Sequence, residues 1–167
     1  DKSLWALDTV TCNEAKEFSQ KHIAENIISH RVVSKDEAIN LSDVDPKAYE
    51  AMIGLEKYLA QSGLDKILYE LIKIRASQIN GCAYCINMHT KDARKNGETE
   101  QRIYLLNAWR EVKDLYTDEE KAILALTEEM TLIANGGVAD ETYQKAKSLF
   151  DDNHLAQIMV AIITINA

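Results

Sequence analysis

Apolar residues recur along most of this chain at steps of three and four, the spacing that places them on one face of an α-helix. Met52, Leu55 and Leu59, for example, form such a stripe. We find no convincing strand pattern and no internal repeat. The spacing predicts a succession of helices, over 13–30, 46–62, 64–79, 82–97, 98–115, 118–134, 141–150 and 154–167.

Local signals mark the ends of several of these helices. Asp45 and Pro46 stand where a capping acceptor and a first helical residue are expected. The run 117–120 is a capping box, with Glu three residues after Thr. Asp140 is expected to cap the helix that follows it. The range 31–44 is polar and irregular, so we interpret it as a connector.

The composition is that of an ordinary folded domain. Hydrophobic residues make up 46% of the 167 positions and charged residues 28%, which argues against disorder. A single proline and six glycines favour long, uninterrupted helices. We therefore expect an all-α fold, a compact multi-helix bundle.

Charge and hydropathy restrict the possible partners. The formal net charge is −8, so a nucleic acid is not expected as the main partner. The most apolar run, 155–167, is interrupted by polar residues and is shorter than the roughly 20 residues of a membrane span. The first residues lack the basic-then-apolar layout of a signal peptide, so we expect a reducing cytoplasm and no membrane association.

Reactive residues concentrate in one motif. Cys82 and Cys85 are three residues apart, and His89 follows four residues later, so all three share one helix face. Asn80-Gly81 breaks the preceding helix and puts Cys82 in a first turn, where free backbone amides favour a thiolate. A thiolate can attack an oxidant, and the second cysteine can then close a disulfide, with the histidine as proton carrier.

Other interpretations of this motif have to be weighed. Two cysteines on an apolar helix face can be buried core residues. Cys82, Cys85 and His89 can also supply three ligands to zinc, although no second pair offers a fourth. A thioredoxin-type site is disfavoured, because the βαβ pattern that carries such a motif is missing.

The run 70–94 reads ELIKIRASQINGCAYCINMHTKDAR, with a glutamate twelve residues before the first cysteine. Together with LLNAWR at 105–110 and the terminal INA, it closely resembles the alkylhydroperoxidase D-like branch of the carboxymuconolactone decarboxylase family. The resemblance spans about 40–167, which we take as a helical domain of that type, and leaves 1–39 as an N-terminal helical extension. It implies a homo-oligomer, a dimer, trimer or hexamer, with the site near subunit contacts.

The same resemblance implies a thiol-dependent peroxidase that reduces hydrogen peroxide or organic hydroperoxides. Cys85 would be the peroxidatic cysteine and Cys82 the resolving one, with His89 activating Cys85 and Glu70 in a proton relay. No metal or other cofactor is expected, only an external dithiol or redox-protein reductant. Two alternatives remain: a lyase like the carboxymuconolactone decarboxylases, or a non-catalytic, redox-sensing oligomer.

Three residues complicate this assignment. Tyr84 stands where the well-studied peroxidase of the family has a second histidine, and a phenol with a pKa near 10 carries protons poorly at neutral pH. Glu70 has a second interpretation, as a solvated carboxylate paired with Lys66 or Lys73. Cys12 lies in the segment that the resemblance does not cover, and we interpret it as a buried or incidental thiol.

Overall fold

The computed structural model describes residues 39–167, which form helices joined by turns, with no strand among them. The helices are α2 (Leu41–Val44), α3 (Pro46–Leu59), α4 (Lys66–Asn80), α5 (Ala83–Lys95), α6 (Glu100–Leu105), the 3₁₀-helix η1 (Leu106–Glu111), α7 (Asp118–Thr131), the 3₁₀-helix η2 (Ile133–Asn135), α8 (Asp140–Leu149) and α9 (Asp152–Asn166). The predicted all-α class is confirmed. The helix predicted over 13–30 lies outside the described residues. No helix within 39–167 is long and apolar enough to cross a membrane.

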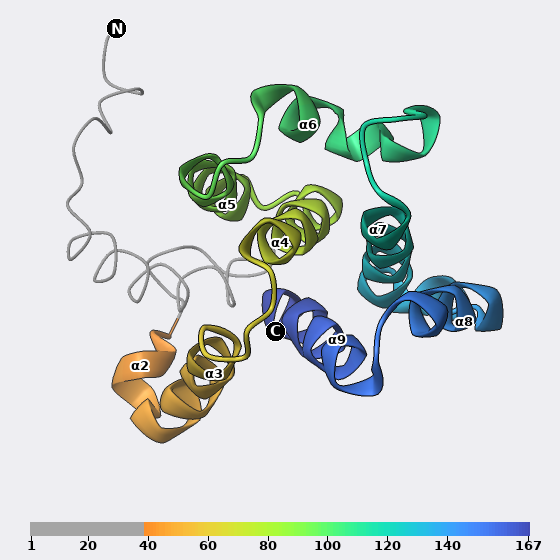
Figure 1. The fold of residues 1–167 in the computed structure, drawn as a ribbon. Coiled ribbons are helices and arrows are strands. Elements are labelled where there is room, and N and C mark those ends of the chain that lie inside the picture. Colours follow the sequence, from red (N-terminus) through yellow and green to blue (C-terminus); the bar gives the residue numbers. More distant parts are fainter. Residues whose placement is uncertain (1–38) are drawn as a thin grey trace, which may run out of the picture. The chain divides into compact units, whose positions relative to one another are not determined.

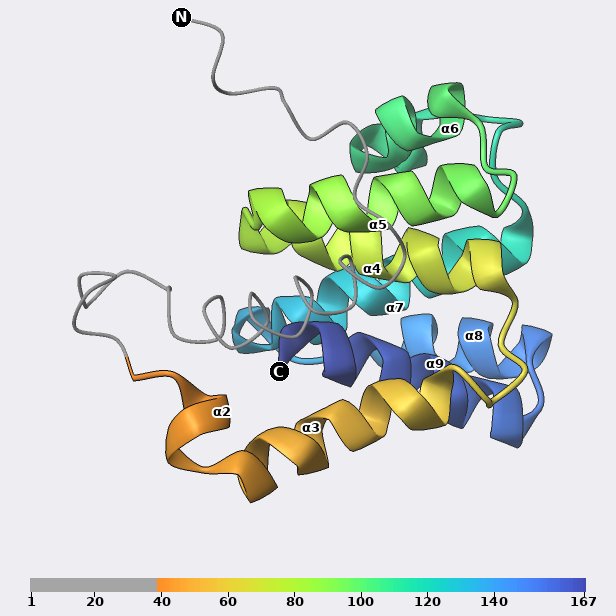
Figure 2. The ribbon, with the colours of Figure 1, turned by 90° about the vertical axis from the view of Figure 1, so that its left-hand side faces the viewer.

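The chain divides into two compact units, one ending at Gly54 and the other comprising Leu55–Ala167. The predicted division into 1–39 and 40–167 stays a prediction. Within the second unit α4 is central, because it packs against α5, α7 and α9 (Figure 1). Figure 2 shows α4 and α5 running side by side in opposite directions.

The hydrophobic core lies on both sides of α4. Ile72 packs into a cluster with residues of α7, α8 and α9, whereas Leu71 and Ile74 pack with residues of α5, α6, η1 and α7. All five consecutive residues of 70–74 are consequently buried. Two of these five, Glu70 and Lys73, carry ionisable side chains, so the centre of the fold contains charged groups that need partners.

The single helix predicted over 98–115 is wrong, because a residue beyond its end interrupts it. The Tyr116 hydroxyl donates to the carbonyl of Arg102. The amide of Leu106 bonds to Ile103 instead, three residues back, and the chain tightens into η1. The apolar spacing therefore predicted the right face but not the change of helix type.

The connector predicted over 31–44 is wrong at its end, where Leu41–Val44 forms the one-turn helix α2. The side chain of Asn40 accepts the amide of Ser42 at 3.1 Å and so caps this turn. Asparagine is favoured both in loops and as an N-cap, and here the second role applies. Residues 31–38 lie outside the described part.

Two of the three predicted helix caps form, and the third is replaced by a contact from another helix. Asp45 caps α3 by accepting a backbone amide three residues later at 3.1 Å, and the capping box at Thr117 forms with both of its bonds. The predicted cap at Asp140 is wrong, because this residue is the first of α8 and makes no capping bond. The amide of Ala139 instead donates to Glu129 of α7 at 2.9 Å.

Candidate functional site

The turn between α4 and α5 presents the two cysteines. Gly81 follows the last residue of α4 with φ at 65°, a left-handed conformation that strains residues with a side chain. The amide of Cys82 donates back to the carbonyl of Ser77 at 3.0 Å and closes the turn. Cys82 is thereby the N-cap of α5, at the helix start where the Asn80-Gly81 break predicted it.

Cys82 and Cys85 are joined by a disulfide, with their Cα atoms 5.4 Å apart. The Sγ atom of Cys82 also accepts the backbone amide of Cys85 at 3.3 Å, as an N-cap side chain does. Both cysteines are partly exposed, so the alternative that they are buried core residues is wrong. When the disulfide is open, the same amide and the helix N-terminus favour negative charge on Cys82.

His89 and Glu70 form a buried pair across the α4–α5 interface. His89 Nδ1 lies 2.8 Å from Glu70 Oε2, and only 7% and 8% of the two side chains are exposed. With Glu70 ionised, Nδ1 donates this hydrogen bond, and Nε2 remains for proton exchange. His89 follows Cys85 by four residues in α5, so one helical turn separates them.

The alternative for Glu70 was a solvated carboxylate paired with Lys66 or Lys73. The structure instead pairs Glu70 with His89 in a buried contact. The Lys73 ammonium binds Glu56 of α3 instead. The structure thus brings Glu70 together with His89, and Cys82 together with Cys85, as two adjoining pairs on α4 and α5.

Lys73, Glu56 and Tyr69 form a second polar group, in which Lys73 is buried and the other two side chains are partly exposed. The Tyr69 hydroxyl donates to Glu56 at 2.6 Å, and the Lys73 ammonium lies 4.7 Å from the centre of the Tyr69 ring. Burial raises the pKa of Glu56, but the Lys73 ammonium and the hydrogen bonds from Lys73 and Tyr69 bring it below its ordinary value. Burial lowers the pKa of Lys73, opposed by the carboxylates of Glu56 and Glu70.

The sequence carries a signal for this second group, although its members were not among the predicted site residues. Glu56 lies on the apolar stripe of α3, between Met52 and Leu59 at helical spacing. Lys73 interrupts the apolar run Leu71-Ile72-Lys73-Ile74. A charged residue on an otherwise apolar face, matched by one of opposite sign on another helix, indicates a buried ion pair.

Two further sequence expectations concern metal binding and Tyr84. Within 39–167, no group of three or more His, Cys, Asp or Glu side chains is arranged to hold a metal ion. Burial, and then the charge of Asp92, raise the pKa of Tyr84 above its ordinary value. Tyr84 therefore keeps its proton at neutral pH and is a weaker proton carrier than a histidine at this position would be.

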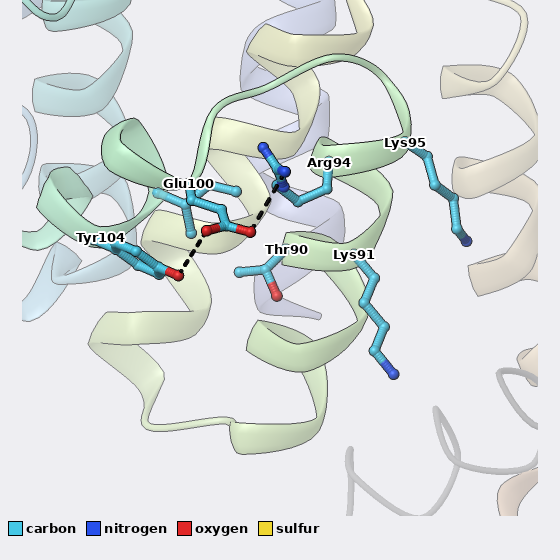
Figure 3. Close-up of a pocket in the computed structure, with 7 residues that line it drawn as sticks. Thr90, Lys91, Arg94, Lys95, Glu100 and Tyr104 are labelled. Carbon is cyan, nitrogen blue, oxygen red and sulfur yellow. Dashed lines mark hydrogen bonds and ion pairs between the residues drawn. The ribbon is translucent and has the colours of Figure 1, made fainter. Parts of the chain in front are cut away.

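A separate open pocket of about 380 Å³ lies between α5 and α6 (Figure 3). Arg94 pairs with Glu100 across it at 3.4 Å, and the Tyr104 hydroxyl donates to the same carboxylate at 3.2 Å. Figure 3 shows the side chains of Lys91 and Lys95 extending away from Glu100. Neither the cysteines nor the buried pair lines this pocket, so it is distinct from the site at the disulfide.

Comparison with known proteins identifies the family. The sequence model of the Carboxymuconolactone decarboxylase family matches residues 46–129, half of the chain. This chain belongs to the carboxymuconolactone decarboxylase family. The uncharacterized protein YdfG of Bacillus subtilis is 46% identical to it over 129 residues, which are 77% of this chain and 87% of YdfG.

Two further relatives place the chain in the alkylhydroperoxidase D-like branch of the carboxymuconolactone decarboxylase family. One is a crystal structure of an Agrobacterium tumefaciens protein of unknown function, with a suggested role as an antioxidant defence protein AhpD. It matches this chain with a TM-score of 0.71 and 41% sequence identity. The match covers 77% of this chain and 87% of that one. Alkyl hydroperoxide reductase AhpD of Corynebacterium kroppenstedtii is 28% identical over 109 residues, 58% of this chain and 60% of that protein. The predicted family and fold type are confirmed, whereas the oligomer, the reductant and the cytoplasmic location stay predictions.

Proposed function

We propose that this protein is a thiol-dependent peroxidase that reduces hydrogen peroxide or organic hydroperoxides. The observation that carries the proposal is the Cys82–Cys85 disulfide at the start of α5, one turn before a histidine bound to a buried glutamate. Such a disulfide is the state that a two-cysteine peroxidase reaches after one reaction with peroxide. The name of the Corynebacterium kroppenstedtii relative supports the same chemistry.

The proposed cycle begins with both cysteines reduced. The Cys85 thiolate attacks one peroxide oxygen; an S–O bond forms, the O–O bond breaks, and the leaving oxygen takes a proton to give an alcohol or water. The Cys82 thiolate then attacks the Cys85 sulfenic acid; the S–S bond forms, and hydroxide leaves with a proton as water. The two electrons that reduce the peroxide come from the two sulfurs.

An external dithiol completes the cycle. One of its thiolates attacks the Cys82 sulfur and forms a mixed disulfide, with Cys85 as the leaving thiolate. The second thiolate then closes the reductant's own disulfide and releases Cys82. Two electrons return to the enzyme, and the two thiol protons of the reductant end on Cys82 and Cys85.

The buried pair supplies the proton transfers. His89 accepts the thiol proton of Cys85 and returns it to the leaving oxygen, because an imidazole exchanges protons near neutral pH. Glu70 holds Nδ1 of the ring at 2.8 Å, so Nε2 is the nitrogen that acts. Its carboxylate also balances the positive charge that His89 carries while it holds the proton.

The test is peroxide consumption by the full chain with dithiothreitol as the dithiol, using hydrogen peroxide and tert-butyl hydroperoxide. The wild type should turn over many times. Cys85→Ser should be inactive, and His89→Ala should lose about 100-fold or more, as expected for removal of a general base. Without dithiothreitol, Cys82→Ser should consume one equivalent of peroxide and stop, with a sulfenic acid on Cys85 that mass spectrometry detects.

Cys12→Ser is the matched control, because it removes the one cysteine outside the motif and should leave turnover unchanged. Turnover that persists in Cys85→Ser would contradict the role assigned to that cysteine. A wild type that forms the disulfide once, but is not returned by any dithiol, would identify a redox sensor instead. Absence of any peroxide-induced disulfide would favour the lyase alternative.

A further inference from the structure

Lys73 is a buried lysine beside the proposed relay. Only 1% of its side chain is exposed, in the middle of α4, three residues beyond Glu70. Its ammonium binds Glu56, and because Glu70 precedes it by three residues in α4, the two side chains occupy neighbouring positions on one helix face. The two carboxylates differ in exposure: Glu56 reaches solvent with 35% of its side chain, whereas Glu70 is buried with 8%.

A lone buried carboxylate tends to take up a proton, because a charge in a poorly solvated site is costly. Glu70 is buried, and its hydrogen-bond partner His89 is neutral for part of the proposed cycle. A nearby ammonium that stays charged throughout would offset this cost. Lys73 is suited to that task, because Glu56 binds its ammonium from a different helix; burial lowers the pKa of Lys73, and this carboxylate opposes that effect.

The charge on Glu70 determines what His89 can do. An ionised Glu70 can only accept a hydrogen bond, so Nδ1 carries the hydrogen and Nε2 keeps its lone pair. A neutral Glu70 can donate to Nδ1, which would move the ring hydrogen to Nε2 and remove the lone pair that accepts the thiol proton.

We propose that Lys73 is a positioning residue, whose ammonium keeps Glu70 ionised and through it fixes the Nδ1–H tautomer of His89. The effect on catalysis rests on the proposed peroxidase function, whereas the tautomer is a property of the resting protein and can be measured without any activity. A merely structural ion pair between Lys73 and Glu56 would leave the tautomer of His89 unchanged.

The first experiment is nuclear magnetic resonance of the disulfide form at pH 7, with two-bond ¹H–¹⁵N correlations of the histidine rings, assigned with His89→Gln. The wild type should show the Nδ1–H tautomer of His89. Lys73→Met should shift the population to Nε2–H. Lys66→Met is the matched control, since it changes an exposed lysine of the same helix, and it should leave the tautomer as in the wild type.

The proposal is overturned if Lys73→Met retains the Nδ1–H tautomer. Should Lys73→Met fail to fold, Lys73→Gln keeps a polar side chain for Glu56 and Glu70 without the charge, and the same shift is expected. The carboxyl ¹³C resonance of Glu70 in the wild type gives a test without any variant. A protonated Glu70 at pH 7 would overturn the proposal, and an ionised one supports it.

The second experiment is a double-mutant cycle on the rate at which peroxide closes the Cys82–Cys85 disulfide. Lys73→Met alone should slow this step about tenfold, and less than about twofold when Glu70 is already glutamine, since residues in one network are not additive. An undiminished effect in the Glu70→Gln background would overturn the proposal. If the wild type does not react with peroxide, the proposed function fails, and the tautomer measurement still decides the role of Lys73.

Discussion

Replacing Glu128 with alanine should destabilise the protein by about 3 kcal/mol. This carboxylate of α7 accepts hydrogen bonds from Arg75 of α4 and from the Trp109 indole of η1, each at 2.8 Å. Hydrogen bonds to a charged group each contribute about 1.5–3 kcal/mol when their partners lie away from solvent. Arg75 is largely buried and Trp109 almost completely, so both donors would be left without this acceptor.

A third partner of Glu128 should contribute much less. Arg110 donates to the outer oxygen at 2.7 Å, but 56% of its side chain is exposed, and exposed ion pairs contribute about 0–1 kcal/mol. Arg110→Ala is therefore the matched control, which removes both hydrogen bonds of Arg110 to the same carboxylate, and its contact with the Trp109 ring, without leaving a buried group unpaired.

The assay is urea unfolding at pH 7 and a fixed protein concentration, so that any assembly equilibrium is the same for all variants. Glu128→Ala should lower the free energy of unfolding by about 3 kcal/mol and Arg110→Ala by less than about 1 kcal/mol. A loss below about 1 kcal/mol for Glu128→Ala, or equal losses for the two variants, would show that the buried hydrogen bonds to Glu128 do not stabilise the fold as described.

Three other predictions follow from the helix ends and from this carboxylate. Burial raises the pKa of Glu128, but hydrogen bonds from Trp109, Arg110 and Arg75 outweigh it and leave the pKa below its ordinary 4.5. The stability that ionised Glu128 contributes is complete above pH 4.5 and is lost as the pH falls through its lower folded-state pKa. Acid titration followed by circular dichroism should therefore show a smaller loss of stability for Glu128→Gln than for the wild type. Gly81→Ala forces a side chain into a left-handed φ and should cost about 1 kcal/mol in urea unfolding; an unchanged midpoint would contradict the strain argument. Thr117→Ala removes half of the capping box and should cost about 1 kcal/mol by the same measurement, with Thr117→Ser close to the wild type.

Features set by neighbours in the chain were predictable from the sequence. The caps at Asp45 and Thr117 and the break at Gly81 depend on residues within four positions of one another. The spacing of Cys82, Cys85 and His89 is likewise local, so the helix that carries them could be placed from the order of residues alone. Helix periodicity and capping predicted these features, but not the start of α8, where the cap expected at Asp140 does not form.

Features that depend on distant residues were not predictable in the same way. The break after α6 needs the Tyr116 hydroxyl at the carbonyl of Arg102, fourteen residues away. The partner of Glu70 is nineteen residues away on another helix, whereas the lysine at i+3 that local rules favour is bound by Glu56. These contacts follow from how α3, α4 and α5 pack, and an apolar stripe predicts that a face is buried but not which polar group meets it.

The position of α4 in the middle of its unit restricts which amino-acid substitutions the protein can accept. Glu70 and Lys73 lie in the same buried turn as Leu71, Ile72 and Ile74, so a substitution that adjusts proton transfer there also alters core packing. On α5, by contrast, only His89 and Ala93 are buried. Laboratory evolution toward a new substrate should therefore accumulate its tolerated substitutions along α5 and leave 70–74 unchanged.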